Sequence, residues 1–142
     1  MTETFDIDGK TYEVTGNPTL RTVREVQQEQ ENFLFEHIDE KHLTDADALS
    51  DESELVKLIL DSGGKQALLD VRWERSIMLP RQTISLACDT LLESDKFNSL
   101  TAQEFQEIKS LSEEKLGGDA NDFFNELGIG ISLTEEEIEK HM

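Results

Sequence analysis

Two patterns of hydrophobic spacing follow one another in residues 4–41, TFDIDGKTYEVTGNPTLRTVREVQQEQENFLFEHIDEK. The order of these two patterns decides the predicted fold. Up to residue 15 apolar and polar residues alternate, which is typical of β-strands, and Asp8-Gly9 is the signal of a tight hairpin turn because glycine accepts a positive φ. The apolar face of this predicted hairpin carries Phe5, Ile7, Tyr12 and Val14. Because an isolated two-stranded hairpin is marginally stable in water, we expect that face to pack on a helical body or on another protein's sheet.

The spacing changes to that of an amphipathic helix at Leu20. Pro18 fixes φ and Thr19 suits the N-cap position, so a helix is predicted from Leu20 to about Lys41. Its apolar residues fall on one stripe: Leu20, Val23, Val26, Phe33, Leu34 and Ile38. A helix of this length is long for so small a domain, so part of the stripe is expected to face a partner.

The rest of the chain is predicted to be helical, with loops at glycines, prolines and short polar residues. Residues 42–52 are predicted to form a surface loop before a helix that Ser50 or Asp51 caps and Ser62-Gly63-Gly64 ends. Further helices are predicted over 65–78, 80–92, 101–116, 119–127 and from Thr134 to the C-terminus, with Pro80 in the first turn of its helix and an apolar turn over 128–131. The predicted fold is therefore mainly α, a single domain over 1–142 of about five to seven helices, with a hairpin over 1–16 and a helical body over 19–142.

The charge balance excludes several classes of partner. The chain of 142 residues holds 32 acidic and 13 basic residues, a net charge of −19, so it would repel the phosphates of nucleic acid and an anionic membrane surface. The charge is spread evenly, with 6 − 17 = −11 over residues 1–71 and 7 − 15 = −8 over residues 72–142, and so does not form an acidic tail. This composition is similar to that of proteins from extreme halophiles, in which molar salt screens such repulsion; an acidic mesophilic protein is the alternative.

No group of residues in the sequence has the spacing of a known catalytic or metal-binding motif. Cys88 is the only cysteine and lies in an apolar stretch, so we expect a buried structural thiol. The three histidines have no metal-binding spacing, and the acidic residues near Asp6 and Asp45 do not fit a calcium loop. No phosphate-binding loop or nucleophile motif is present. The sequence therefore predicts a protein that is not an enzyme and has no catalytic residue, cofactor or metal.

Two segments are candidates for contact with another protein. Residues 65–81 have a local charge of 4 − 2 = +2, and they contain Arg72, Trp73, Arg75 and Arg81, of types enriched at interface hot spots. The alternative is that these arginines pair with carboxylates of the same chain and that Trp73 fills the core. In the long helix, Phe33 fits the buried stripe and Phe35 lies off it, which makes Phe35 a candidate for an exposed binding residue; the alternative is a broad core face that includes both. Phe5 and Tyr12 of the hairpin complete the set of candidate protein-binding residues.

The stretch Phe5 to Glu25, with Gly9-Lys10-Thr11-Tyr12 and Pro18-Thr19-Leu20-Arg21, resembles the start of the tail assembly chaperones of long-tailed viruses. The resemblance covers about a sixth of the chain. It implies a helper without enzymatic activity that coats the tape measure protein, keeps its apolar helices in solution and recruits tail tube protein. It also implies that the protein acts in the host cytoplasm, and the acidic composition would make the virus one of haloarchaea.

Two other functions remain open at this point. The chain could be a structural virion subunit of the tail, the connector or the capsid, whose hairpin extends a neighbour's sheet and which stays in the particle. It could also be a cellular acidic helical adaptor. All three functions imply protein partners and leave a homo-oligomer open, and the net charge argues against nucleic acid and a membrane for each of them.

Overall fold

The computed structural model describes residues 3–39, 41, 51–128 and 133–142, and it is mainly helical with an N-terminal β-hairpin, as predicted. Strands β1 (Glu3–Ile7) and β2 (Lys10–Val14) are antiparallel, with Phe5 opposite Tyr12. Asp8 and Gly9 both have positive φ, 52° and 79°, which is the backbone of a type I′ turn and suits the right-handed twist of the strands. The predicted hairpin is confirmed.

The apolar face of the hairpin packs on the helical body. Its four core side chains form one cluster with buried residues of the body: Ile84, Ala87, Cys88, Leu92 and Ile108. The backbone N–H groups of Thr15 and Gly16 both donate to the carbonyl oxygen of Ala87, at 2.9 and 3.0 Å, which fixes the end of the hairpin to the body. The apolar face of the hairpin is therefore covered by the helical body of the same chain, which was the first of the two predicted surfaces.

Helix α1 (Leu20–Phe35) begins where predicted and ends earlier than the predicted Lys41. After Phe35 the chain continues in tighter i→i−3 hydrogen bonds, from the N–H of His37 to Leu34 and from that of Ile38 to Phe35. The N–H of Asp39 then donates to the hydroxyl of Ser62 at 2.9 Å. The chain thus leaves the helix at Phe35 and makes a tertiary contact at Asp39 that no local pattern contains.

Helix α3 (Glu52–Ala87) merges three of the predicted helices. The Asp51 carboxylate caps it, and Gly64, with φ 69° and ψ −164°, interrupts it at the predicted break. Beyond Gly64 the helix is continuous through Pro80 to Ala87, so the predictions that Pro80 starts a helix and that this helix reaches Leu92 are wrong. A proline inside a helix costs about 3 kcal/mol, but the next turns, residues 82–88, are buried without exception, and this burial outweighs that cost.

The C-terminal part agrees with the predicted boundaries. A short 3₁₀ helix, η2 (Ser94–Phe97), precedes α4 (Ala102–Leu116), which has the predicted Thr101/Glu104 capping box and ends at left-handed Gly117. Helix α5 (Ala120–Leu127) is capped by Asp119, and α6 (Glu135–Lys140) by Thr134. The predicted loop over 42–52 and the apolar turn over 128–131 lie largely outside the described residues.

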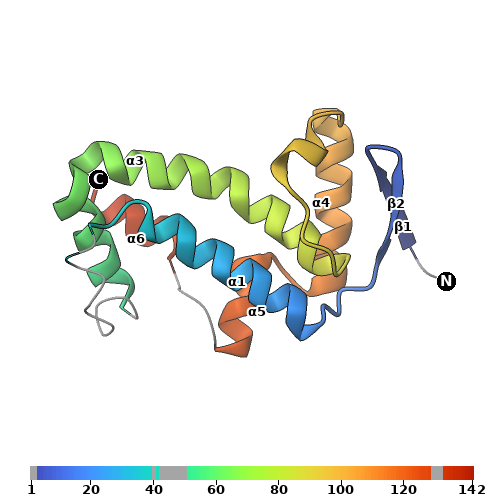
Figure 1. Ribbon diagram of the computed structural model, residues 1–142, viewed down its shortest axis with the longest axis horizontal. Coiled ribbons are helices and arrows are strands. Elements are labelled where there is room, and N and C mark those ends of the chain that lie inside the picture. Colours follow the sequence, from blue (N-terminus) through green and yellow to red (C-terminus); the bar gives the residue numbers. More distant parts are fainter. Residues whose placement is uncertain (1–2, 40, 42–50, 129–132) are drawn as a thin grey trace.

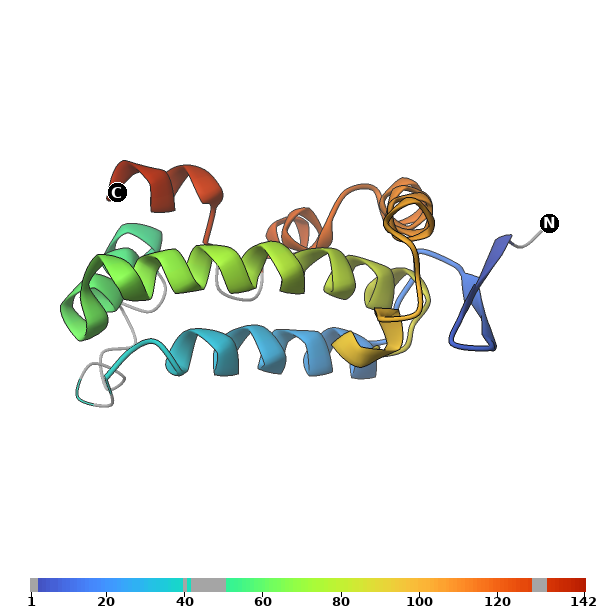
Figure 2. The ribbon, with the colours of Figure 1, turned by 90° about the horizontal axis from the view of Figure 1, so that it is seen from above.

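Helix α3 is the central element of the fold. Helix α1 runs along one side of it, and α4, α5 and α6 lie along the other, while the hairpin lies at one end (Figures 1 and 2). Three apolar clusters follow the length of α3: one under the hairpin, one in the middle around Val26, Leu86 and Phe124, and one around Leu34, Ile59 and Ile138. Figure 2 also shows that a side of α3 is left without a covering helix. No helix among the described residues is long and apolar enough to span a bilayer.

Candidate protein-binding surface

The arginines of residues 65–81 are held by carboxylates of the same chain. Arg72 bridges two residues of α6, with its Nε 2.6 Å from Glu135 Oε1 and its Nη2 3.2 Å from Glu139 Oε1. Arg81 donates from Nη2 to Glu29 Oε1 at 2.6 Å and from Nη1 to the Leu92 carbonyl at 2.9 Å. These contacts agree with the alternative of intramolecular ion pairs, and they tie α3 to α6 and to α1.

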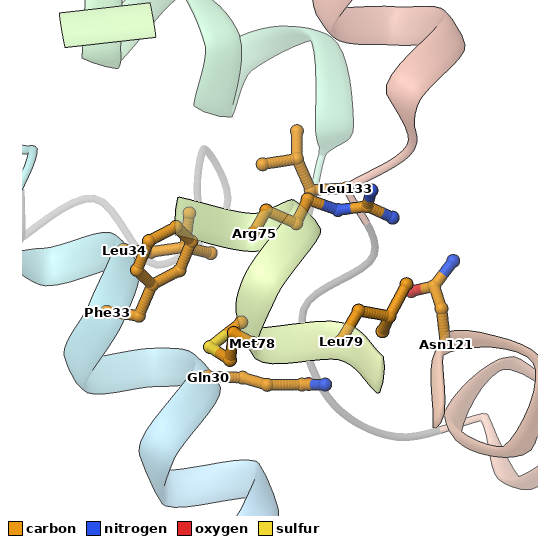
Figure 3. Close-up of a pocket in the computed structure, with 8 residues that line it drawn as sticks. All are labelled: Gln30, Phe33, Leu34, Arg75, Met78, Leu79, Asn121 and Leu133. Atoms are coloured by element: carbon orange, nitrogen blue, oxygen red, sulfur yellow. The ribbon is translucent and has the colours of Figure 1, made fainter. Parts of the chain in front are cut away.

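Arg75 also points into the protein. Its side chain is 12% exposed, and Nη1 lies 3.9 Å from Glu135 Oε2. Figure 3 shows the Arg75 side chain extending toward Leu133 and away from Phe33 and Leu34, at a small cavity that all eight labelled residues line. The cavity volume is about 20 Å³, which is room for about one water molecule. Such a space is too small for a substrate or an organic cofactor.

Trp73 is the exception in this segment, because it is 69% exposed and does not fill the core. Leu69 and Ile77 are 42% and 51% exposed, and the three residues follow one another at i, i+4 and i+8 along α3. Residues four apart lie on the same face of a helix, so these side chains form one continuous row. We call Leu69, Trp73 and Ile77 the α3 ridge.

Leu69 and Ile77 are surface residues that were not predicted from the sequence. Leu68 and Val71, their neighbours in sequence, are fully buried and define the opposite, core-facing side of α3. The available signal was the width of the apolar set: these four residues and Trp73 spread over more of the helix circumference than one buried face occupies. Only the position of the neighbouring helices shows which part of that set is covered.

The phenylalanines and the hairpin aromatics are less accessible than predicted. Phe33 is half-buried, packs against the cluster around Leu34 and makes an edge-on contact with His37, with ring centroids 5.6 Å apart. Phe35 is also half-buried, which agrees with the alternative of a broad core face better than with an exposed binding residue. Phe5 and Tyr12 are 8% and 9% exposed and stack on each other under the hairpin. The structure therefore does not bring the predicted binding residues together, and Trp73 alone of them is well exposed.

The surface beside the α3 ridge carries carboxylates. Asp70 accepts a hydrogen bond from Gln66 Nε2 at 3.0 Å, and Glu74 lies 3.1 Å from His37 Nε2 with 48% of its side chain exposed. Both residues are exposed on α3, one on each side of Trp73 in the sequence. Among the described residues, no three His, Cys, Asp or Glu side chains are grouped so that they could hold a metal ion.

Asp89 holds Thr19, the N-cap residue of α1, from another part of the chain. It has φ 53°, and its Oδ1 accepts from the N–H of Thr19 at 2.8 Å and from the Thr19 hydroxyl at 2.9 Å. Burial acts to raise the pKa of Asp89, but the hydrogen bonds from Thr22 and Thr19 and the charge of Arg21 lower it below its ordinary value of 3.8. A carboxylate at a helix N-terminus is also favoured by the helix dipole.

We expect Asp89→Asn to lower the free energy of unfolding at neutral pH by up to about 1 kcal/mol, because the side chain stays compatible with positive φ and only the charge is lost. A carboxylate with a depressed pKa stabilises the fold above 3.8, and this contribution disappears as the pH falls through the pKa of the folded state. Urea unfolding at about pH 7 and about pH 3 measures the difference, which should shrink at the lower pH. Asp61→Asn, at an exposed position, is the control; an Asp89 effect that is equal at both pH values would contradict the assignment.

Cys88 is buried, as predicted, and burial raises the pKa of its thiol from 9.0 to about 11. At about pH 8 the thiolate fraction in the folded protein is then about 100-fold smaller than in the unfolded chain. We expect an aromatic disulfide reagent to react with Cys88 at least that much more slowly in buffer than in guanidinium. The folded-state rate should still be rising above about pH 9; a plateau below this pH would show an accessible, ordinary thiol.

Comparison of the chain with models of protein families, with curated proteins and with solved structures gave no match.

Proposed function

We propose that this protein is a tail assembly chaperone of a long-tailed virus, which binds tape measure protein and tail tube protein without catalysing a reaction. The observation that carries the proposal is the α3 ridge, a row of three exposed apolar side chains in a chain with a net charge of −19. Three exposed apolar side chains in one row, on a surface that is otherwise strongly charged, are typical of a site for another protein.

The fold suits a protein that holds another protein's apolar helix. The ridge lies on the part of α3 that follows Gly64, and the opposite side of this helix is fixed by the buried residues Leu68 and Val71. A helix whose backbone is already folded has a smaller ordering cost on binding than a segment that folds when it binds. High like charge on the outside of the complex would keep chaperone and bound partner dispersed. The hairpin and the Pro-Thr-Leu-Arg turn supply the family resemblance.

Co-expression with a tape measure protein tests the proposal. We expect the chain to increase the soluble fraction of that protein, and we expect Leu69→Ser/Ile77→Ser to lose most of this effect. Leu20→Ser/Leu127→Ser is the matched control, because these leucines are 62% and 51% exposed and lie on α1 and α5, away from the ridge. An unchanged soluble fraction of the tape measure protein with the wild-type chain would refute the function.

A structural virion subunit is the second candidate, and the hairpin favours it. The sheet of the described residues has two strands, so β1 and β2 each have one edge without a strand partner. An exposed edge can pair with a strand of a neighbouring subunit. The chaperone is expected to be absent from finished particles, whereas a structural subunit would be found in them. Mass spectrometry of purified virions distinguishes the two.

The proposed host is a haloarchaeon, and this can be tested on the isolated protein. Nineteen uncompensated charges repel one another over a Debye length of about 8 Å at physiological salt and about 3 Å at molar salt. We therefore expect the thermal midpoint, followed by circular dichroism, to rise between about 0.1 M and about 2 M KCl. A midpoint that is constant or falls over this range would argue for a mesophilic host.

A further inference from the structure

The shape of the α3 ridge suits one kind of ligand. Leu69, Trp73 and Ile77 project from a convex helix surface and span about 12 Å along its axis. Side chains at i±4 spacing form the ridges that fit between the side chains of a second helix. A pocket for a small molecule would require a concave surface, and the cavity nearest to this segment holds about one water molecule.

The charges around the ridge determine the chemistry of that helix. The sequence of residues 65–81 has four basic and two acidic residues, which would favour an acidic partner. The fold adds three carboxylates, from Glu29, Glu135 and Glu139, that contact the arginines, so the balance becomes 4 − 5 = −1. The three arginines contact carboxylates of other helices, so the exposed charged side chains of residues 65–74 on this helix are two carboxylates, Asp70 and Glu74, and one amine, Lys65.

A second copy of the chain is a poor occupant. Three side chains cannot supply the roughly 1,200–2,000 Å² that a stable dimer buries. Two copies that met at their ridges would also bring Asp70 and Glu74 of each close to those of the other, in a chain of net charge −19. A short segment of opposite charge encounters neither obstacle.

We infer that the α3 ridge binds an amphipathic helix whose apolar side chains pack on Leu69, Trp73 and Ile77 and whose flanking positions are Lys or Arg. The inference rests on the use of the ridge in the proposed function and names the kind of segment bound there. The apolar contact supplies affinity, and the basic flanks, paired with Asp70 and Glu74, select the partner over acidic helices.

Trp73, the only tryptophan, allows binding to be measured by its own fluorescence. The probes are three peptides of about four helical turns: a leucine face with lysine flanks, the same face with glutamate flanks, and the lysine peptide in scrambled order. With the first we expect a saturable blue shift, because the indole leaves water. We expect at least tenfold weaker binding of the glutamate peptide and no shift with the scrambled one.

Substitutions on both parts of the site complete the test. Leu69→Ser/Ile77→Ser should weaken the lysine peptide at least tenfold, and the control Leu20→Ser/Leu127→Ser should leave its affinity unchanged. Asp70→Lys/Glu74→Lys, at exposed positions, should reverse the preference, so that the glutamate peptide binds more tightly. Helical circular dichroism of each variant shows whether it is folded.

Three outcomes of the fluorescence measurements would overturn the inference. The first is equal or tighter binding of the glutamate peptide to the wild-type chain. The second is no shift with any peptide. The third is a concentration-dependent blue shift without peptide that Ile77→Ser abolishes, which would make a second copy the occupant. The two proposals can fail separately. If the lysine peptide binds as expected and the tape measure protein is not kept soluble, the inference about the α3 ridge stands and the chaperone function fails. If the tape measure protein is kept soluble equally by the ridge variant, the ridge inference fails alone.

Discussion

Gly16→Ala is expected to lower the free energy of unfolding by about 3 kcal/mol, the larger part of it from a steric overlap. Gly16 has φ 68°, and a Cβ at this position would overlap the backbone carbonyl group of Lys115, near the end of α4. The same residue is held from the other side by the hydrogen bond from its N–H to the Ala87 carbonyl. Neither backbone segment can move without separating the hairpin from the body.

Gly117→Ala measures the cost of a positive φ for alanine without the steric overlap that a Cβ meets at Gly16. Gly117 has φ 87° at the C-cap of α4, but a Cβ there would meet no atom within 4 Å. We expect this variant to lose about 1 kcal/mol, the ordinary cost of a left-handed alanine. Urea unfolding followed by circular dichroism measures both variants. Equal losses would show that Gly16 is not confined between α3 and α4.

Gln82→Met is expected to cost about 1–3 kcal/mol, because it leaves a buried amide without its partner. Gln82 is fully buried, accepts from Gln30 Nε2 at 3.0 Å and donates to Glu29 Oε1 at 2.8 Å. Gln30 is 8% exposed and would lose the acceptor of that bond. This hydrogen-bonded chain fixes how α1 lies against α3, in the middle of the molecule.

The double variant Gln30→Met/Gln82→Met tests this explanation. Replacing both partners removes the unsatisfied group, so we expect the double variant to be more stable than the sum of the two single losses by at least about 0.5 kcal/mol. Gln66→Met is the control, because Gln66 is exposed and bonds only to Asp70 in the same helix; its effect should stay within about 0.5 kcal/mol. Additive losses would mean that the two amides do not depend on each other.

The parts of the fold that were predictable from sequence depend on neighbours within about four residues. The hairpin turn at Asp8-Gly9, the capping box of Thr101 and Glu104 and the stop at Gly117 are all of this kind. Each satisfies backbone groups or dihedral angles locally, so the same chemistry operates before and after folding. These predictions are confirmed with nearly the expected boundaries.

The errors lie where distant contacts override local preference. Pro80 is a helix breaker by local rules, yet it lies inside α3 because the turns beyond it are buried between α1, α4 and α5. Helix α1 stops at Phe35, where contacts of the following residues with α3 replace further helical turns. Asp89 accepts hydrogen bonds from Thr19, the N-cap residue of α1, which lies 70 positions earlier in the chain. No window of sequence contains both members of such a contact.

The candidate site shows the same division. Composition alone established that the chain is strongly acidic and that residues 65–81 contain its single tryptophan among four basic residues. Composition could not give the net charge that residues 65–81 present to a partner. Glu29, Glu135 and Glu139 are far away in sequence and reach the arginines only after folding. Ion pairs form between groups that are close in space, whatever their separation along the chain. The residue types were therefore a property of the sequence, whereas the exposure of Leu69, Trp73 and Ile77 and the sign of the charge beside them were decided by the packing of α1 and α6 against α3.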